Sequence, residues 1–290
     1  MKYAMKLVLV AVLSLSILAG CKPPAVVDNK TIKISDSSAL RPLVTAVAEK
    51  FNITNPDVKF KVNEGVSGNG PKDVFAGTVD IGNSDVPAAE VILAADAATL
   101  IDNKVCVVGV AVVLSTDLNS YLNWSKEEII KIFTGKVKNW KELDGPDLPI
   151  VVINRPTTSE TRALFTKWGL DGGKMIDGDT ALQTDDSNAI IKTMATAKGA
   201  ISYVPFPYIK DNADVVAAAA IDGVEPTNEF IYDGTYQIWG YEHMYTKGEP
   251  TNPTVKSFLT FMESTGAETQ MEEMNYGIIS KLSKKVAASR

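Results

Sequence analysis

The sequence is poor in the side chains that most often carry out catalysis. Its 290 residues include one histidine, His243, and two cysteines, Cys21 and Cys106. A single histidine with so few cysteines offers no nucleophile–base pair of the usual kind. No cluster of potential ligands has the spacing of a zinc site. Paired carboxylates such as Asp185 and Asp186 are typical of a solvated helix start rather than of an acid–base pair. The sequence therefore predicts that the protein is not an enzyme and needs no metal or cofactor.

The sequence also lacks an apolar run that would cross a bilayer comfortably. The run at 7–20, LVLVAVLSLSILAG, follows Lys2 and Lys6 and ends in small residues, as an export signal does. Its end, L-A-G-C, resembles the lipobox of bacterial lipoproteins, in which the cysteine is lipidated and becomes the mature N-terminus. We expect a signal peptide at 1–20, a lipid on Cys21 and a tether at 21–30. Cleavage that leaves Cys21 unmodified is the alternative.

Positive charge is in deficit. Lysine and arginine number 29 against 35 acidic residues, a formal net charge of −6. Removal of residues 1–20 would take away two lysines and bring the charge to −8. Nucleic-acid-binding proteins usually present a basic face, so this balance argues against such a partner. Any bound anion must be held by local groups rather than by the field of the whole protein.

The rest of the chain alternates between strand-like and helix-like segments. TIKIS (31–35), VKFKV (58–62) and PIVVIN (149–154) are typical of strands. Apolar residues from Leu40 to Phe51 recur at helical spacing, with Ser38 as a natural N-cap. A capping box, Ser125 with Glu128, predicts a further helix in 125–135. This alternation predicts an α/β architecture with mostly parallel sheets, and at this length two lobes.

One strand is predicted to be buried on both faces. The segment from Val105 to Leu114 is nearly all apolar and rich in valine. Cys106 lies inside it, which favours an inert buried thiol. If Cys21 carries a lipid, no disulfide is possible within the mature chain.

Three small polar loops each stand between a strand and a helix. They are Asp36–Ala39, Val66–Gly70 and Arg155–Arg162. The first turn of a helix leaves backbone N–H groups without partners, and its dipole favours negative charge. Open α/β sheets also bind ligands beyond the carboxyl ends of their strands. If the loops converge, they form a cage of donors for a small oxyanion, although each loop alone is also typical of a capped helix. Neither nucleotide-binding glycine motif is complete in the second loop.

These loops resemble the binding motifs of the phosphate-binding proteins of bacterial ABC phosphate transporters. The likeness extends over roughly residues 30 to 280. The matching segments are SSALRPL (37–43), VSGNG (66–70), GTVDIGNSD (77–85), GKVKNW (135–140), R-P-T-T-S-E-T-R (155–162) and GAISY (199–203).

The resemblance implies a two-lobed Venus-flytrap fold of the type II periplasmic-binding-protein kind, with two mixed, mostly parallel sheets flanked by helices. Lobe one would comprise 31–109 plus 236–290, and lobe two 110–235. The implied function is that of an extracytoplasmic lipoprotein, monomeric and anchored to a bacterial membrane, that captures inorganic phosphate. Its implied partners are a permease and an ATPase subunit of an ABC importer.

The same resemblance implies the residues that hold phosphate. It assigns donor hydroxyl or backbone N–H groups to one set of residues, a charged hydrogen bond to Arg155 and an accepting carboxylate to Asp85. The donors are Ser38, Ala39, Ser67, Ser159, Glu160 and Thr161. Arg162 would be a supporting group that pairs with an acid.

An acid in an anion site is explained by the protons of the ligand. Phosphate at neutral pH carries at least one O–H group, which Asp85 can accept, whereas sulfate carries none. A buried, unmatched acceptor costs roughly 1–3 kcal/mol or more, so Asp85 would reject sulfate. A turn cap after Ser84 is the alternative role for this carboxylate.

Two positions depart from the family pattern, because Glu160 and Asp36 stand where glycine is usual. We expect the Glu160 side chain to turn outward or to pair with Arg162, or else the affinity to be altered. Arsenate or a molybdate-like anion is the alternative ligand, and a signalling or adhesion module on the same fold is the alternative function.

Overall fold

The computed structural model describes residues 29–63, 68–176 and 182–290. The predicted signal peptide, Cys21 and Ser67 lie outside these ranges, so their roles stay predictions. Among the described residues, no helix is both long enough and apolar enough to span a membrane.

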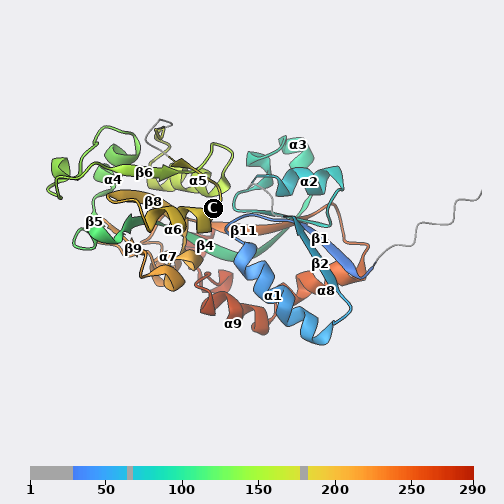
Figure 1. Ribbon diagram of the computed structural model, residues 1–290. Coiled ribbons are helices and arrows are strands. Elements are labelled where there is room, and N and C mark those ends of the chain that lie inside the picture. The colour runs from blue at the N-terminus through green and yellow to red at the C-terminus, as the bar shows by residue number, and fades with distance from the viewer. Residues whose placement is uncertain (1–28, 64–67, 177–181) are drawn as a thin grey trace, which may run out of the picture.

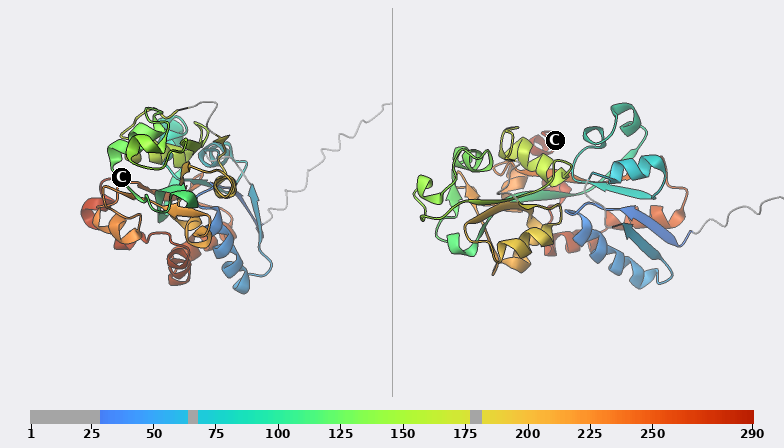
Figure 2. Two further views of the ribbon diagram at one scale, coloured as in Figure 1. Left: turned by 60° about the vertical axis from the view of Figure 1, so that its left-hand side comes forward. Right: turned by 45° about the horizontal axis from the view of Figure 1, so that its top comes forward.

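Two long strands run through the middle of the molecule and join its two halves (Figure 1). They are β4 (Ile101–Ser115) and β11 (Trp239–Thr246), which pair antiparallel from Trp239 opposite Gly109 to Thr246 opposite Ile101. The strand order β2-β1-β3-β11-β4-β8-β6-β7 makes one continuous hydrogen-bonded path. Figure 2 shows the two groups of elements on either side of this central pair.

One half is built on three strands at the β11 side. β1 pairs parallel with both β2 and β3, and β3 pairs antiparallel with β11. The strands are β1 (Thr31–Ser35), β2 (Lys59–Asn63) and β3 (Ile81–Ser84). The helices of this half are α1 (Arg41–Thr54), α2 (Gly70–Ala76), α3 (Ala94–Ala97), α8 (Pro253–Met262) and α9 (Thr265–Glu273).

The other half is built at the β4 side. β8 pairs antiparallel with β4 and parallel with β6, which in turn pairs parallel with β7. Its strands are β5 (Asn123–Trp124), β6 (Val151–Asn154), β7 (Leu182–Gln183), β8 (Ala200–Pro205), β9 (Val216–Ala218) and β10 (Ala220–Ile221). The helices beside them are α4 (Lys126–Phe133), α5 (Glu160–Leu164), α6 (Ser187–Met194) and α7 (Asn228–Asp233), and α10 (Lys284–Ala287) contacts α7.

Most predicted elements are confirmed close to their predicted bounds. TIKIS is β1, and the valine-rich segment is the buried part of β4, with Cys106 fully buried and free. β4 is longer than the apolar run, and the side chains of its first five residues alternate between half-buried and exposed. The α/β class with parallel strands in each half is confirmed, and the antiparallel pairs all involve β4 or β11.

The predicted start of the first helix is wrong. α1 begins at Arg41, and Leu40 occupies the N-cap position without a side-chain cap. Pro42 explains the shift, since proline is tolerated only in the first turn, where its missing N–H has no intrahelical partner. The hydroxyl of Ser37, not Ser38, accepts a hydrogen bond from the Leu40 N–H at 3.0 Å. Ser38 is thereby left in the loop that precedes the helix.

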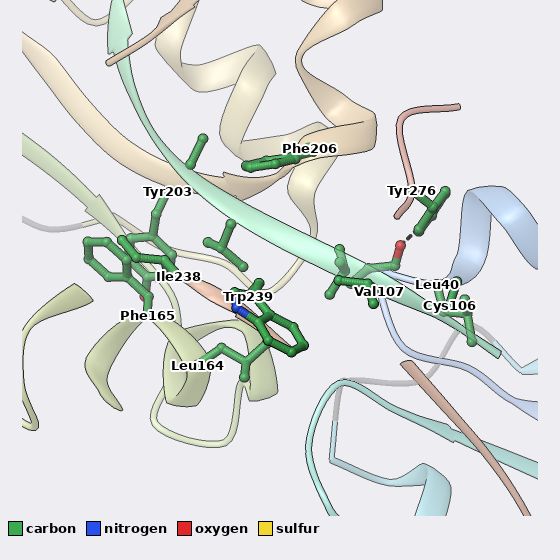
Figure 3. Packing of buried hydrophobic residues seen from close by; sticks show 14 of the residues in the cluster. Leu40, Cys106, Val107, Leu164, Phe165, Tyr203, Phe206, Ile238, Trp239 and Tyr276 are labelled. Carbon is green, nitrogen blue, oxygen red and sulfur yellow. Dashed lines mark hydrogen bonds between the residues drawn. The ribbon is translucent and has the colours of Figure 1, made fainter. Parts of the chain in front are cut away.

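The core extends across both halves along β4. Figure 3 follows this strand from Cys106 and Val107, near Leu40 and Tyr276, toward Phe206 and Tyr203. Phe165 stacks on Tyr203 with ring centroids 4.3 Å apart. Gly109 lies against Phe206, and a Cβ atom at this position would come within 2.3 Å of the ring. The central strand must be bare there for the Phe206 ring to pack on it.

We expect Gly109→Ala to lower the free energy of unfolding by about 1–3 kcal/mol, because the added methyl group overpacks the Phe206 contact. Urea denaturation measures the change. Gly266→Ala is the matched control: this glycine lies inside α9, and the nearest atom to an added Cβ is 3.7 Å away. The control should be neutral or slightly stabilising. Equal effects of the two substitutions would contradict the contact.

Candidate functional site

Three strands from the two halves end at the same place beside the central pair. β1 leads into Asp36–Ala39, β3 into Asp85, and β6 into the loop 155–159 that precedes α5. The structure buries every predicted site residue that it describes, none being more than 3% exposed. These residues are Ser38, Ala39, Asp85, Arg155, Ser159, Glu160 and Thr161.

Direct hydrogen bonds connect the two halves at this place. The Thr161 hydroxyl donates to Asp85 Oδ2 at 2.8 Å. The Tyr208 hydroxyl, just after β8, donates to the Ser38 carbonyl at 2.6 Å. The first and third predicted loops therefore approach each other beside Asp85, at the end of β3. Residues 66 and 67 of the second loop lie outside the described residues, and at its described end a Cβ on Gly68 would lie 3.0 Å from the Thr158 carbonyl oxygen of the third loop.

Glu160 does not turn outward, so that alternative among the three expected for it is wrong. Its carboxyl group reaches the end of β3, where Oε1 lies 2.7 Å from Ser84 Oγ and Oε2 accepts from the Asp85 N–H at 2.8 Å. Glu160 therefore contributes two further hydrogen-bond contacts between the halves. Burial is the main cause that raises its pKa well above the ordinary value, and the Asp85 carboxylate adds to the shift.

The Arg155 side chain is fully buried and is held by hydrogen bonds. Its Nη1 donates to the Asp185 carbonyl and its Nη2 to the Ser187 hydroxyl, both at 2.8 Å. The Asp185 carboxylate lies 3.5 Å from Nη1 and is only 11% exposed. The sequence interpretation of Asp185 as part of a solvated helix start is therefore wrong. Arg155 Nε is buried and has no hydrogen-bond partner among the described residues.

The start of α5 follows the predicted pattern for a helix cap. Ser159 is the N-cap, and its hydroxyl oxygen accepts from the Arg162 N–H at 3.3 Å. Its hydroxyl proton stays available to donate elsewhere. Arg162 Nη1 donates to the Arg155 carbonyl, so this side chain supports the loop.

The glycines around β3 allow an unusually close backbone approach. A Cβ on Gly70 would lie 2.0 Å from the Asn83 carbonyl oxygen, and one on Gly82 would lie 2.1 Å from the Gly70 carbonyl oxygen. α2 therefore begins directly against the strand that carries Asp85. Any side chain at either glycine would push the two backbones apart.

Sequence reasoning missed two tyrosines and an asparagine. Tyr276 donates to the Ala39 carbonyl at 2.6 Å, as Tyr208 does to that of Ser38, so the first loop is held from both sides. Asn83 donates to Asp36 Oδ1 at 2.7 Å. The only sequence signals near these residues are the motifs GTVDIGNSD, which contains Asn83, and GAISY, which precedes Tyr208. The two tyrosines bond to residues far away along the chain, and such contacts leave no local pattern.

Buried acids surround this place. Burial raises the pKa of Asp85 to about 6, and the hydroxyl groups of Ser37 and Thr161 oppose the shift. Burial likewise raises the pKa of Asp36 to about 7, against the hydrogen bond from Asn83. Glu242 on β11 is fully buried and its pKa lies well above the ordinary value for the same reason. Among the described residues, no group of His, Cys, Asp and Glu could hold a metal ion.

The comparisons identify the family. A model of the PBP superfamily domain matches residues 24–265. The chain is 47% identical over 234 residues to the phosphate-binding protein PstS of Bacillus subtilis, covering 81% of this chain and 75% of that protein. The chain therefore belongs to the PBP superfamily and, within it, to the family that contains the Bacillus subtilis protein.

Solved structures agree with this family. One is a phosphate ABC transporter substrate-binding protein from Clostridium perfringens with bound phosphate, with a TM-score of 0.76 and 28% identity. The match covers 86% of this chain and 99% of the Clostridium perfringens chain. An ABC-type phosphate transport receptor from Vibrio cholerae has a TM-score of 0.67 over 85% of this chain and 99% of its own. At 23% identity this second match supports the fold alone.

Asp36 should make the stability of the folded protein depend on pH. Its pKa rises from the ordinary 3.8 to about 7 on folding, so the folded protein binds more protons between these values. The free energy of unfolding therefore falls as pH rises from about 4 to about 7, by roughly 3–4 kcal/mol from this group. Asp36→Asn should lack this contribution. Urea denaturation at about pH 5 and about pH 7.5 measures it, and a wild-type-minus-variant difference that is the same at both pH values would contradict it.

Proposed function

We propose that this protein captures inorganic phosphate outside the cytoplasm and delivers it to an ABC importer. The observation that supports this most is the meeting of the three strand-end loops at one buried place, with one arginine and one accepting carboxylate. Membership of the family of the Bacillus subtilis phosphate-binding protein agrees with it. A substrate-binding role accounts for a buried site that brings together no nucleophile–base pair among the described residues.

In this proposal each predicted residue has a defined role. The Ser38 and Ser159 hydroxyl groups donate to phosphate, and Arg155 supplies the positive charge. Backbone N–H groups donate from Ala39, Glu160 and Thr161, because the Thr161 hydroxyl is already bound to Asp85. Ser67, outside the described residues, would add a further donor.

Asp85 is proposed to recognise the phosphate proton. Oδ2 accepts from Thr161, and the Ser37 hydroxyl also lies beside this carboxylate. Oδ1 is buried and has no hydrogen-bond partner of good geometry among the described residues. An O–H group of phosphate would satisfy Oδ1. Sulfate would place an unprotonated oxygen there, and two acceptors in contact are unfavourable.

We also propose the bounds of the two lobes and the attachment of the protein to a membrane. Lobe one would comprise 31–109 plus 236–290 and lobe two 110–235, with β4 and β11 crossing between them. A lipid on Cys21 would anchor the chain to a bacterial membrane, and a monomer would meet a permease and an ATPase subunit. These proposals rest on the L-A-G-C segment and on the family.

The direct test is calorimetric titration of residues 22–290, stripped of ligand, with phosphate, sulfate, arsenate and molybdate. We expect phosphate to bind and sulfate to give no heat, with arsenate behaving like phosphate. Binding of molybdate but not phosphate would replace the proposed ligand. No heat with any of these anions would overturn the proposed function.

Asp85→Asn should reduce the preference for phosphate over sulfate by about tenfold or more, because an unmatched buried acceptor costs at least 1–3 kcal/mol. The measured quantity is the ratio of the two dissociation constants. Asp57→Asn, an exposed acid on the surface, is the control and should leave the ratio unchanged. The same ratio in wild type and Asp85→Asn would show that this carboxylate does not sort the anions.

A further inference from the structure

The contact between Glu160 and Ser84 has one proton too few if Glu160 is ionised. Ser84 Oγ lies 2.7 Å from Glu160 Oε1 and also 2.7 Å from the Val86 carbonyl oxygen. A serine hydroxyl has one proton to donate, and a carbonyl oxygen can only accept. With an ionised Glu160, one of these two short oxygen–oxygen contacts would hold no proton.

A proton on Glu160 removes the conflict. Oε1–H then donates to Ser84 Oγ, and the Ser84 hydroxyl donates onward to the Val86 carbonyl. Oε2 continues to accept from the Asp85 N–H at 2.8 Å. Every short contact of this group then joins one donor to one acceptor.

We propose that Glu160 is a positioning residue that carries a proton in this arrangement, that the two halves part when no phosphate is bound, and that phosphate binding is therefore accompanied by uptake of this proton from solvent. The proposal rests on the proposed function. The Glu160 carboxyl group, on α5, contacts the Ser84 hydroxyl and the Asp85 N–H at the end of β3. These contacts fix the position of the Asp85 carboxylate. Separating the two halves must break both contacts and expose the carboxyl group to water.

The surroundings of Glu160 favour its neutral form. Three carboxyl groups face it from other elements: Asp85 at the end of β3, Asp185 before α6, and Glu242 on β11. Tyr245, also on β11, is near enough for Glu160 to raise its pKa. Arg155 and Arg162 are the cations of the same loop and helix. Arg155 donates to the Asp185 carbonyl and to Ser187, and Arg162 donates to the Arg155 carbonyl. Burial, the largest effect, raises the pKa of Glu160 well above 4.5.

The direction of the pH effect follows from counting protons. A solvated glutamate has a pKa of about 4.3 and is ionised at neutral pH. Closing the site on phosphate moves one proton from solvent to Glu160 Oε1, apart from any change in the protons of phosphate itself. Affinity attributable to this step therefore falls about tenfold per pH unit as pH rises from about 5 toward the raised pKa of Glu160.

Glu160→Gln tests the proposal, because the glutamine amide keeps one donor for Ser84 and one acceptor for the Asp85 N–H but cannot take up a proton. Phosphate is titrated into each protein at pH 7 in two buffers of different ionisation enthalpy, which yields the number of protons taken up. We expect wild type to take up about one proton more than Glu160→Gln. As pH rises, the phosphate affinity of wild type should also fall relative to that of Glu160→Gln by about tenfold per pH unit.

Glu90→Gln is the matched control. Glu90 also joins the two halves, through a 3.0 Å ion pair with Lys167, but it is 40% exposed there. Its proton uptake should equal that of wild type. Infrared difference spectra of wild type, phosphate-bound minus free, should show a new band from a protonated carboxyl group. This measurement uses wild type alone, so it does not depend on whether a variant folds.

The outcomes separate this proposal from the proposed function. If wild type gives no heat with phosphate, the function itself is wrong. If wild type binds phosphate but takes up the same number of protons as Glu160→Gln, the proton on Glu160 is wrong while the function stands. Absence of the carboxyl band on phosphate binding would overturn the proposal in the same way.

Discussion

The antiparallel ladder between β4 and β11 holds the two halves of the protein in one sheet, and the position of every loop at the site follows from it. Its hydrogen bonds make one continuous sheet from two halves, so the ends of β1, β3 and β6 come out beside the same pair of strands. Gly109 keeps β4 bare where Phe206 packs on it. Away from this ladder, contacts beyond the strand ends, such as that of Thr161 with Asp85, join the two halves.

Those contacts are dominated by acids, although the proposed ligand is an anion. Asp85 and Glu160 are both buried at the junction, and Asp36 and Glu242 lie nearby. Burying several ionised carboxylates together is very unfavourable, so protons must occupy part of the cluster. A site of this kind distinguishes anions by their protons as well as by their shape, and it links the occupancy of the site to pH.

Much of the fold could be predicted from local pattern. The valine-rich run gave the buried part of β4, the capping box at Ser125 and Glu128 is present, and the loops around Ser38, Asp85 and Ser159 all lie at strand ends. The predictions for Ser38 as a helix cap and Asp185 as a solvated residue were wrong. Pro42 moved the helix start, and the partner of Asp185 is thirty residues away in the sequence, where no spacing rule could reveal it.

The alternation of elements, the position of each polar loop and the kinds of side chain available there could be predicted, because these features depend on neighbours along the chain. Which groups meet depends on tertiary packing, which no local pattern reveals. Glu160 stands where glycine is usual, and from sequence its charge argued for an outward side chain. In the folded protein it contacts Ser84 and Asp85, more than seventy residues away in the sequence, because the packing of α5 against the end of β3 brings these groups together.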